Sequence, residues 1–199
     1  MDWRERYERA AARYAQGETR ELDERQLVQL GNAAWAAGLS LLMAGETEGA
    51  REWLVRAAGR YRESWDTGGA RDAWGRPIAA LKALLIAGED AGEAARWALA
   101  AGAVRAVSPI GRYAGVLALL VLGRDEEAGA IAATLGDGFP GDVAEALRAL
   151  AAHDAQGYRA AVAAVRRSFE EREEFLEDVP VPDTALALVA LGALRRLES

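Results

Sequence analysis

The chain has 199 residues, of which 51% are hydrophobic, and its formal net charge is −7 at pH 7. That apolar content excludes a disordered chain and supplies the core of one domain or two small ones. The negative charge, with no basic run to oppose it, argues against a nucleic-acid partner, and the absence of cysteine excludes disulfides and thiolate metal sites.

Neither a membrane span nor a secretion signal is visible. The longest apolar run, near residues 114–122, is far shorter than the roughly 20 residues that a membrane helix needs. The opening stretch MDWRERYERAAARY is charged and amphipathic, unlike a signal peptide. We therefore expect a soluble, cytoplasmic protein without a membrane partner.

Ala and Leu dominate and no segment alternates with period two, which predicts an all-α protein. The first predicted helix covers residues 2–15, and Gly17 is expected to end it. The second, 21–44, has two apolar faces and is expected to lie between neighbours. Gly45 separates it from a third helix over 46–65.

The middle of the chain predicts four further helices. The loop DTGGARDAWGRP precedes a helix over 77–87, whose first turn accommodates the proline, and the next helix covers 91–103. Ser108 is expected to cap the sixth helix, with Pro109 as its first residue, and Gly123 to end it. A seventh helix extends to about residue 135.

Three more helices complete a set of about ten. Asp142 is expected to cap a helix over 143–152, and a long ninth helix covers 155–174. The connector EDVPVPD is expected to be extended, because a residue that precedes proline disfavours the helical conformation. Asp183 then caps a last helix over 183–197.

Similar strings follow four of the helix breaks. They are GETEGA from Gly45, GEDAGEA from Gly88, GRDEEA from Gly123 and HDAQGYRA from His153. The breaks are 43, 35 and 30 residues apart, which indicates a repeating unit of roughly 34 residues with two helices. Since the loops are short, successive helices should be antiparallel neighbours.

The order of small and large residues in the first unit resembles the tetratricopeptide-repeat family. The matching residues are Gly38, Leu41, Gly45, Ala50, Leu54 and Ala57. A looser second match is Val116, Leu119, Gly123, Ala128, Ala132 and Leu135. A small residue where two helices cross allows close approach, and glycine at the turn allows a positive φ.

This resemblance implies antiparallel helical hairpins stacked as a right-handed α-solenoid, or a compact α-α superhelix. An ordinary Ala-rich helical bundle is the alternative. We expect one all-helical domain over 1–199, with an N-terminal helix in 1–20, hairpin repeats over 21–175 and a capping helix over 183–197.

The sequence offers little for catalysis. His153 is the only histidine, with no nucleophile near it in sequence, and we interpret it as a polar residue at a turn between helices. Glu170, Glu171 and Glu174 resemble half of the Mg²⁺ site of all-helical nucleotide pyrophosphatases, but the second half is not evident and such a run is usually a solvated helix face. We expect no enzyme, no cofactor and no metal.

A non-catalytic domain that binds a protein or peptide is therefore the leading prediction. Helix residues off the packing stripe of a solenoid line its concave surface, where aromatic and Arg side chains serve as binding hot spots. The candidates are Trp35, Trp97, Arg112 and Tyr113, together with Arg71 and Trp74 of the first long loop. The alternative for each is packing in the core.

A second prediction is an immunity protein that neutralises a bacterial toxin. The C-terminal stretch REEFLEDVPVPDTALALVALGALRRLE resembles the ending of all-helical immunity proteins, and an acidic chain suits a basic toxin. The partner itself and the oligomeric state do not follow from the sequence.

Overall fold

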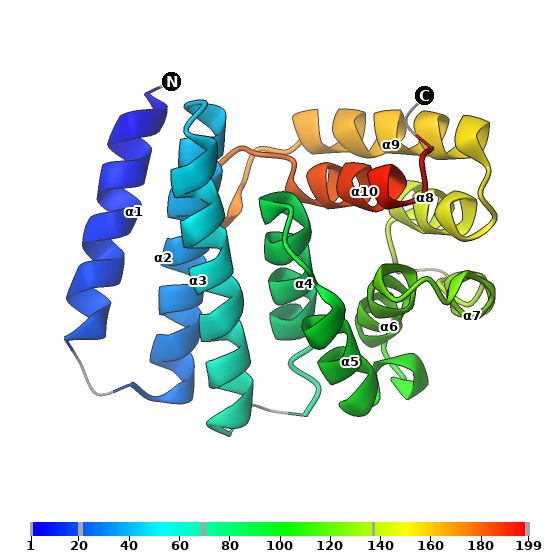
Figure 1. Ribbon diagram of the computed structural model, residues 1–199, viewed down its shortest axis with the longest axis horizontal. Helices are drawn as coiled ribbons and strands as arrows, with labels where there is room; N and C mark the ends of the chain where they lie inside the picture. The colour runs from blue at the N-terminus through cyan, green and yellow to red at the C-terminus, as the bar shows by residue number, and fades with distance from the viewer. Residues whose placement is uncertain (1, 20–21, 69–70, 137, 198–199) are drawn as a thin grey trace. The chain divides into compact units, whose positions relative to one another are not determined.

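Helices account for all the regular secondary structure in the part of the chain that the structure describes. The computed structural model describes residues 2–19, 22–68, 71–136 and 138–197. These residues form ten α-helices and two short 3-10 helices, and none of them forms a strand (Figure 1). The predicted all-α class with about ten helices is confirmed.

The described chain divides into two compact units, where the sequence predicted one domain. Unit 1 comprises the described residues up to Glu89 together with Glu173–Val181, and unit 2 comprises Asp90–Arg172 and the described residues from Pro182 onward. The connector that precedes the last helix therefore belongs to unit 1, although the helices on both sides of it belong to unit 2.

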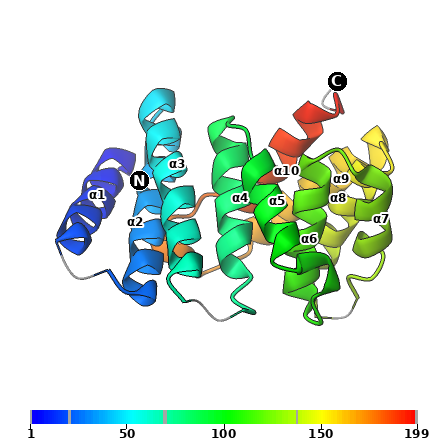
Figure 2. The same cartoon turned by 60° about the horizontal axis from the view of Figure 1, so that its bottom comes forward.

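Unit 1 is a row of four helices. They are α1 (Trp3–Glu18), α2 (Glu24–Met43), α3 (Thr47–Asp66) and α4 (Gly75–Ala87). Each contacts the next, and Figure 2 shows them side by side in sequence order. Asp23 caps α2 through a capping box with Gln26, whose backbone N–H lies 2.8 Å from the Asp23 carboxylate. The two apolar faces of α2 are explained by its place between α1 and α3.

Small residues allow close helix contact in unit 1, as the sequence predicted for the second and third helices. A Cβ atom on Gly38 would lie 2.7 Å from Leu54 Cγ and 3.1 Å from the carbonyl oxygen of Ala50. Gly17 plays the same part between α1 and α2, where a Cβ atom would lie 2.7 Å from Leu30 Cδ2. The prediction that Gly17 ends the first helix is wrong, because this glycine is a packing residue inside α1.

The four aligned breaks share one backbone geometry. Gly45, Gly88, Gly123 and His153 all have left-handed φ angles, of 80°, 70°, 69° and 55°. In each, the amide of that residue donates to the carbonyl three residues back, and the next amide donates to the carbonyl five residues back. This pair of bonds is the Schellman ending of a helix. The sequence alignment of the breaks therefore corresponds to a repeated turn.

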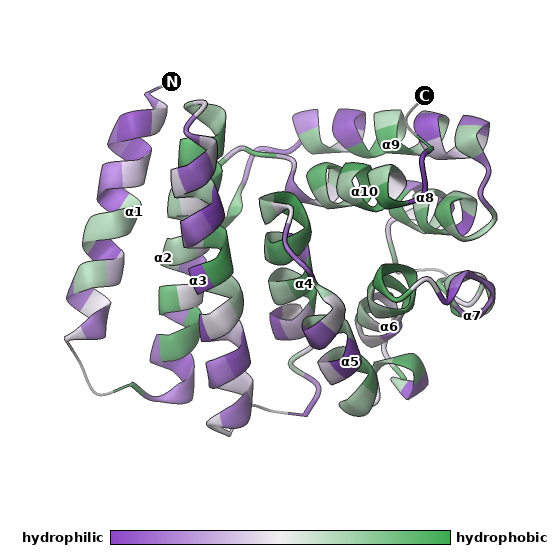
Figure 3. Ribbon diagram, viewed as in Figure 1, coloured by the Kyte–Doolittle hydropathy of each residue, from purple (hydrophilic) through white to green (hydrophobic). Residues whose placement is uncertain are grey.

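The second 3-10 helix, η2 (Leu176–Asp178), also belongs to unit 1, and unit 2 contains the other helices. They are α5 (Gly92–Ala100), η1 (Ala103–Arg105), α6 (Pro109–Val121), α7 (Asp125–Ala132), α8 (Gly141–Ala151), α9 (Ala155–Glu170) and α10 (Asp183–Leu194). Ser108 caps α6, as expected, by accepting a hydrogen bond from the amide of Gly111 at 3.1 Å. Most of α10 is apolar (Figure 3), and it packs on α8 and α9. The hydroxyl of buried Tyr158 donates to the Leu188 carbonyl at 3.2 Å.

Some predicted helix ends are wrong. The ninth helix was expected to reach residue 174, but α9 ends at Glu170. Carboxylates are unfavourable at the negative end of a helix dipole, and four glutamates crowd residues 170–174. Likewise, Asp142 lies inside the first turn of α8, and Pro140 occupies the N-cap.

Candidate partner-binding groove

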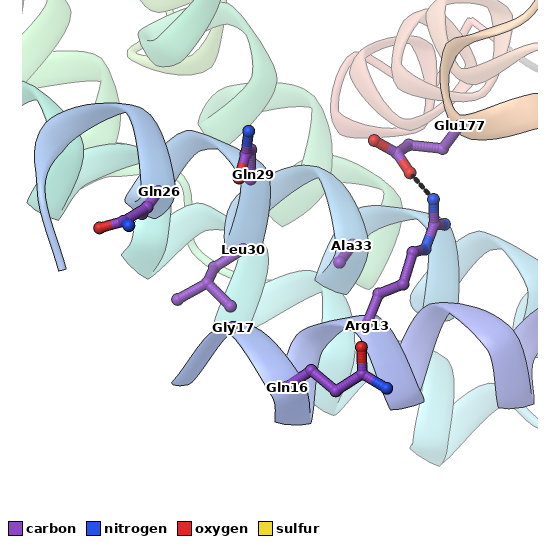
Figure 4. Close-up of a pocket in the computed structure, with 8 residues that line it drawn as sticks. All are labelled: Arg13, Gln16, Gly17, Gln26, Gln29, Leu30, Ala33 and Glu177. Carbon is purple, nitrogen blue, oxygen red and sulfur yellow. Dashed lines mark ion pairs between the residues drawn. The ribbon is translucent and has the colours of Figure 1, made fainter. Parts of the chain in front are cut away.

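A groove runs along α1 and α2 in unit 1, and we call it the α1–α2 groove. It consists of two cavities, of about 340 and about 320 Å³, that share Arg13, Gln16 and Glu177. The first cavity is also lined by Gly17, Gln26, Gln29, Leu30 and Ala33, and the second by Arg6, Arg9, Ala12, Ala36, Asp178 and Val179. The groove is thus formed by two helices and residues 177–179. Figure 4 shows the residues of the first cavity, with Glu177 paired to Arg13.

One wall of the groove is cationic. Arg6, Arg9, Arg13 and Gln16 follow one another on α1 at intervals of three, four and three residues, which places them on one helix face. Half of the Arg13 side chain is exposed, and its Nη1 lies 2.5 Å from Glu177 Oε2. Arg6 donates a hydrogen bond to the carbonyl oxygen of Asp178. Within the described residues, Arg9 has no ion pair or hydrogen bond through its side chain.

The second wall, on α2, presents the Gln29 amide beside apolar carbon, and Gln16 adds an amide at the end of the α1 wall. The amides of Gln16 and Gln29 are exposed and have no hydrogen-bond partner in the described part of the chain. Figure 4 shows both beside Leu30 and Ala33. An amide side chain offers a donor and an acceptor together, which matches the peptide group of an extended chain. The groove therefore has the polar and apolar character of a peptide site.

The third wall is a segment that we call the strap, residues 173–181. It contains four carboxylates, at positions 173, 174, 177 and 178, and no Lys or Arg. Val179 and Val181 are buried, with 3% and 1% of their surface exposed, whereas Leu176 is more than half exposed. The strap is therefore held to unit 1 by two buried valines and by polar contacts to Arg6 and Arg13.

The backbone of the strap is strained at its centre. Glu177 and Asp178 both have a φ angle of 56°, in the left-handed region that residues with a Cβ atom rarely adopt. Such conformations cost on the order of 1–3 kcal/mol each and occur mostly at ligand clamps and switches. The strap therefore holds a conformation that costs free energy.

A cluster between α1 and α3 fixes the orientation of the cationic wall. The Tyr14 hydroxyl accepts a hydrogen bond from Arg60 Nε at 2.8 Å, and the Tyr14 ring meets the ring of Trp53 edge to face, with 5.2 Å between centroids. Burial raises the pKa of the Tyr14 hydroxyl, against the opposite effect of the Arg60 guanidinium. Because Tyr14 adjoins Arg13 in sequence, this anchoring directs Arg13 toward the groove.

The six residues predicted as binding hot spots are divided between the two units. Trp35, Arg71 and Trp74 belong to unit 1, and Trp97, Arg112 and Tyr113 belong to unit 2. Trp35, Trp74, Trp97 and Tyr113 are buried, which agrees with the alternative that each packs in the core. Arg112 is half-buried and Arg71 is exposed.

Packing explains the buried aromatics. The Trp74 ring lies 5.7 Å from that of Trp65, and the Tyr113 ring lies 5.2 Å from that of Phe139. Burial, with a further effect of the Asp183 charge, raises the pKa of the Tyr113 hydroxyl above its usual range. That hydroxyl has no hydrogen-bond partner within the described residues.

Unit 2 holds one cluster of ionisable side chains, around Asp125. His153 Nε2 lies 2.8 Å from Asp125 Oδ2, and Arg195, with 5% of its side chain exposed, donates to Asp125 and to the Leu120 carbonyl. The described side chains that line the adjacent cavity include no hydroxyl or thiol nucleophile. The cluster therefore joins α7, α10 and the turn before α9, with His153 at a turn between helices, as expected.

The glutamates proposed as half of a metal site do not share a helix face. Glu170 is the last residue of α9, and Glu174 lies beyond the helix end in the strap. Among the residues that the structure describes, no three His, Asp or Glu side chains gather as a metal ion would require. None of the described helices is both long and apolar enough to cross a membrane.

The sequence analysis missed the residues of the groove. Their signal was present, because three arginines recur at helical spacing on α1 and the predicted extended connector is acidic. Nothing in the sequence placed the two together. Comparisons of the chain with protein-family models, with curated proteins and with solved structures find no match.

Proposed function

We propose that this protein is a non-catalytic helical scaffold that binds an extended peptide or an extended segment of a protein partner in the α1–α2 groove. The observation that carries the proposal is the groove itself. Exposed amides of Gln16 and Gln29 without a partner in the described chain, a cationic wall and apolar carbon lie together along two helices. Extended chains are recognised by that combination of main-chain hydrogen bonds, charge and apolar contact.

The strap supports the same proposal. It is a piece of the chain's own sequence, a short 3-10 turn (Leu176–Asp178) flanked by extended residues, that already lies against the groove, with two buried valines and two contacts to arginines. The repeated Schellman turns and the small residues at helix crossings support an origin as degenerate tetratricopeptide-like hairpins. An immunity protein would be one case of this function, with a toxin as the partner.

Selection from a displayed library of extended peptides, with the full chain as bait, tests the proposal. Gln29→Ala removes a free amide from the groove and is expected to weaken selected peptides about fivefold, the effect of one hydrogen bond of about 1 kcal/mol. Gln156→Ala, the same change at an exposed glutamine of α9, is the matched control. If both variants bind the selected peptides like the wild type, the groove is not the site.

A further inference from the structure

We propose that the strap is a built-in competitor for the α1–α2 groove, and that the partner is an acidic extended segment that displaces it. This inference rests on the proposed function and specifies the partner's chemistry. It starts from the charge of the groove. The chain as a whole carries a net charge of −7, yet one face of α1 presents Arg6, Arg9 and Arg13.

The strap has the composition of a ligand for that face. It contains four carboxylates, of which Glu177 pairs with the cationic helix, and its two buried valines follow the carboxylates in sequence. Glu177 pairs with Arg13, and the Asp178 backbone accepts from Arg6. A partner that supplies carboxylates followed by β-branched residues would reproduce these contacts, because charge complementarity and apolar burial recognise the same pattern in either chain.

The strap leaves part of the groove unused. Arg9 has no ion pair within the described residues, the amides of Gln16 and Gln29 are free, and cavities of about 340 and about 320 Å³ remain beside Glu177. A separate peptide can extend into this space and add contacts that the strap does not make. A peptide that reaches into this space is therefore able to outcompete the strap.

The strained backbone weakens the strap as a competitor. Glu177 and Asp178 are adjacent left-handed residues with side chains, so docking of the strap is opposed by its own conformation. A free peptide is not tied to a helix at each end and is not forced into those angles. A docked strap multiplies the apparent affinity for the partner by the fraction of molecules whose groove is free.

Fluorescence anisotropy with a labelled peptide of the strap sequence EEFLEDVPVP, titrated with the full chain, tests the inference. The double variant Glu177→Gln/Val179→Ala weakens the docking of the protein's own strap, while the labelled peptide keeps the glutamate and the valine. It is expected to bind the peptide about tenfold more tightly than the wild type, because an ion pair and part of a buried valine oppose strap release. Glu174→Gln, on the same segment with an exposed side chain that makes no contact in the described residues, is the control and should leave affinity unchanged.

Exchanging the charges of Arg13 and of its partner residue in the peptide tests whether the peptide binds beside Arg13. Arg13→Glu is expected to abolish binding of the acidic peptide, and a peptide with Lys at the position of Glu177 should restore it. Circular dichroism melting of each variant separates lost binding from lost folding.

The outcomes of these binding experiments separate the inference about the strap from the proposed function. If the wild type and the double variant bind equally while Arg13→Glu prevents binding, the strap is not a competitor and the proposed function survives. If library peptides bind in the groove but the acidic peptide binds no variant, the stated partner chemistry is wrong. If no peptide of either kind binds in the groove, the proposed function fails as well.

Discussion

Replacement of Gly38 by alanine tests the close crossing of α2 and α3, on which the position of the groove depends. The added Cβ atom would lie 2.7 Å from Leu54 Cγ, 3.0 Å from Leu54 Cδ2 and 3.1 Å from the carbonyl oxygen of Ala50. Leu54 is 1% exposed, so its branch point has no room to retreat.

The expected loss follows from two opposing effects. Overpacking a well-filled core costs about 1–3 kcal/mol, and Gly→Ala inside a helix gains about 1 kcal/mol. Gly38→Ala should therefore lower the free energy of unfolding of unit 1 by about 1 kcal/mol. Gly59→Ala is the matched control, because Gly59 lies exposed inside α3 with nothing within 4 Å of its added Cβ atom. That control should gain about 0.5–1 kcal/mol.

Urea unfolding of the full chain, followed by tryptophan fluorescence, measures both variants. Five of the six tryptophans belong to unit 1, so the signal reports mainly on that unit. We expect a difference of about 2 kcal/mol between the two variants. If Gly38→Ala is as stable as Gly59→Ala, the helices do not approach as the structure describes, and the reasoning from small residues fails.

Two predictions concern unit 2. Tyr113→Phe should raise the free energy of unfolding by about 1 kcal/mol, because it removes a buried hydroxyl without a partner in the described chain. Because the pKa of Tyr113 is raised in the folded state, the unfolded state binds fewer protons than the folded state above about pH 10, and the free energy of unfolding falls there. In urea unfolding at pH 8 and pH 11, the free energy of unfolding of Tyr113→Phe should therefore fall less between the two pH values than that of the wild type. Arg195→Ala should cost about 3 kcal/mol in thermal unfolding, since it leaves Asp125 half-buried without its cation; a loss under 1 kcal/mol would mean that the pair is solvated.

The turns and the first hairpin were predictable because their determinants are local. A glycine after an apolar stripe predicts a left-handed helix ending, and Gly45, Gly88 and Gly123 have that conformation. His153 was aligned with these glycines, and histidine is enriched in the left-handed region relative to most residues with a Cβ atom. Gly38 and Ala50 were expected at a crossing because their spacing places them on facing stripes.

Long-range placement was not predictable. Trp35 lies off the main apolar stripe of its helix. Such a position fits an exposed residue and a residue that a second neighbouring helix buries equally well, and the structure shows that Trp35 is buried. In the same way, Gly17 satisfies the pattern of a helix end and of a close contact. The docking of the strap on α1 joins residues more than 160 positions apart, as Arg13 and Glu177 show, and no local pattern specifies such a pair.

Hydrogen exchange at the strap amides tests the central claim most directly. The amides of Asp178, Val179 and Val181 donate to carbonyls within the strap, at 3.1, 3.1 and 2.9 Å. When the full chain is saturated with the acidic peptide, these amides should exchange faster, while those of α3 stay unchanged, because the peptide replaces the strap on α1. If the strap amides exchange at the same rate or more slowly with the peptide bound, the peptide does not displace the strap and the account is contradicted.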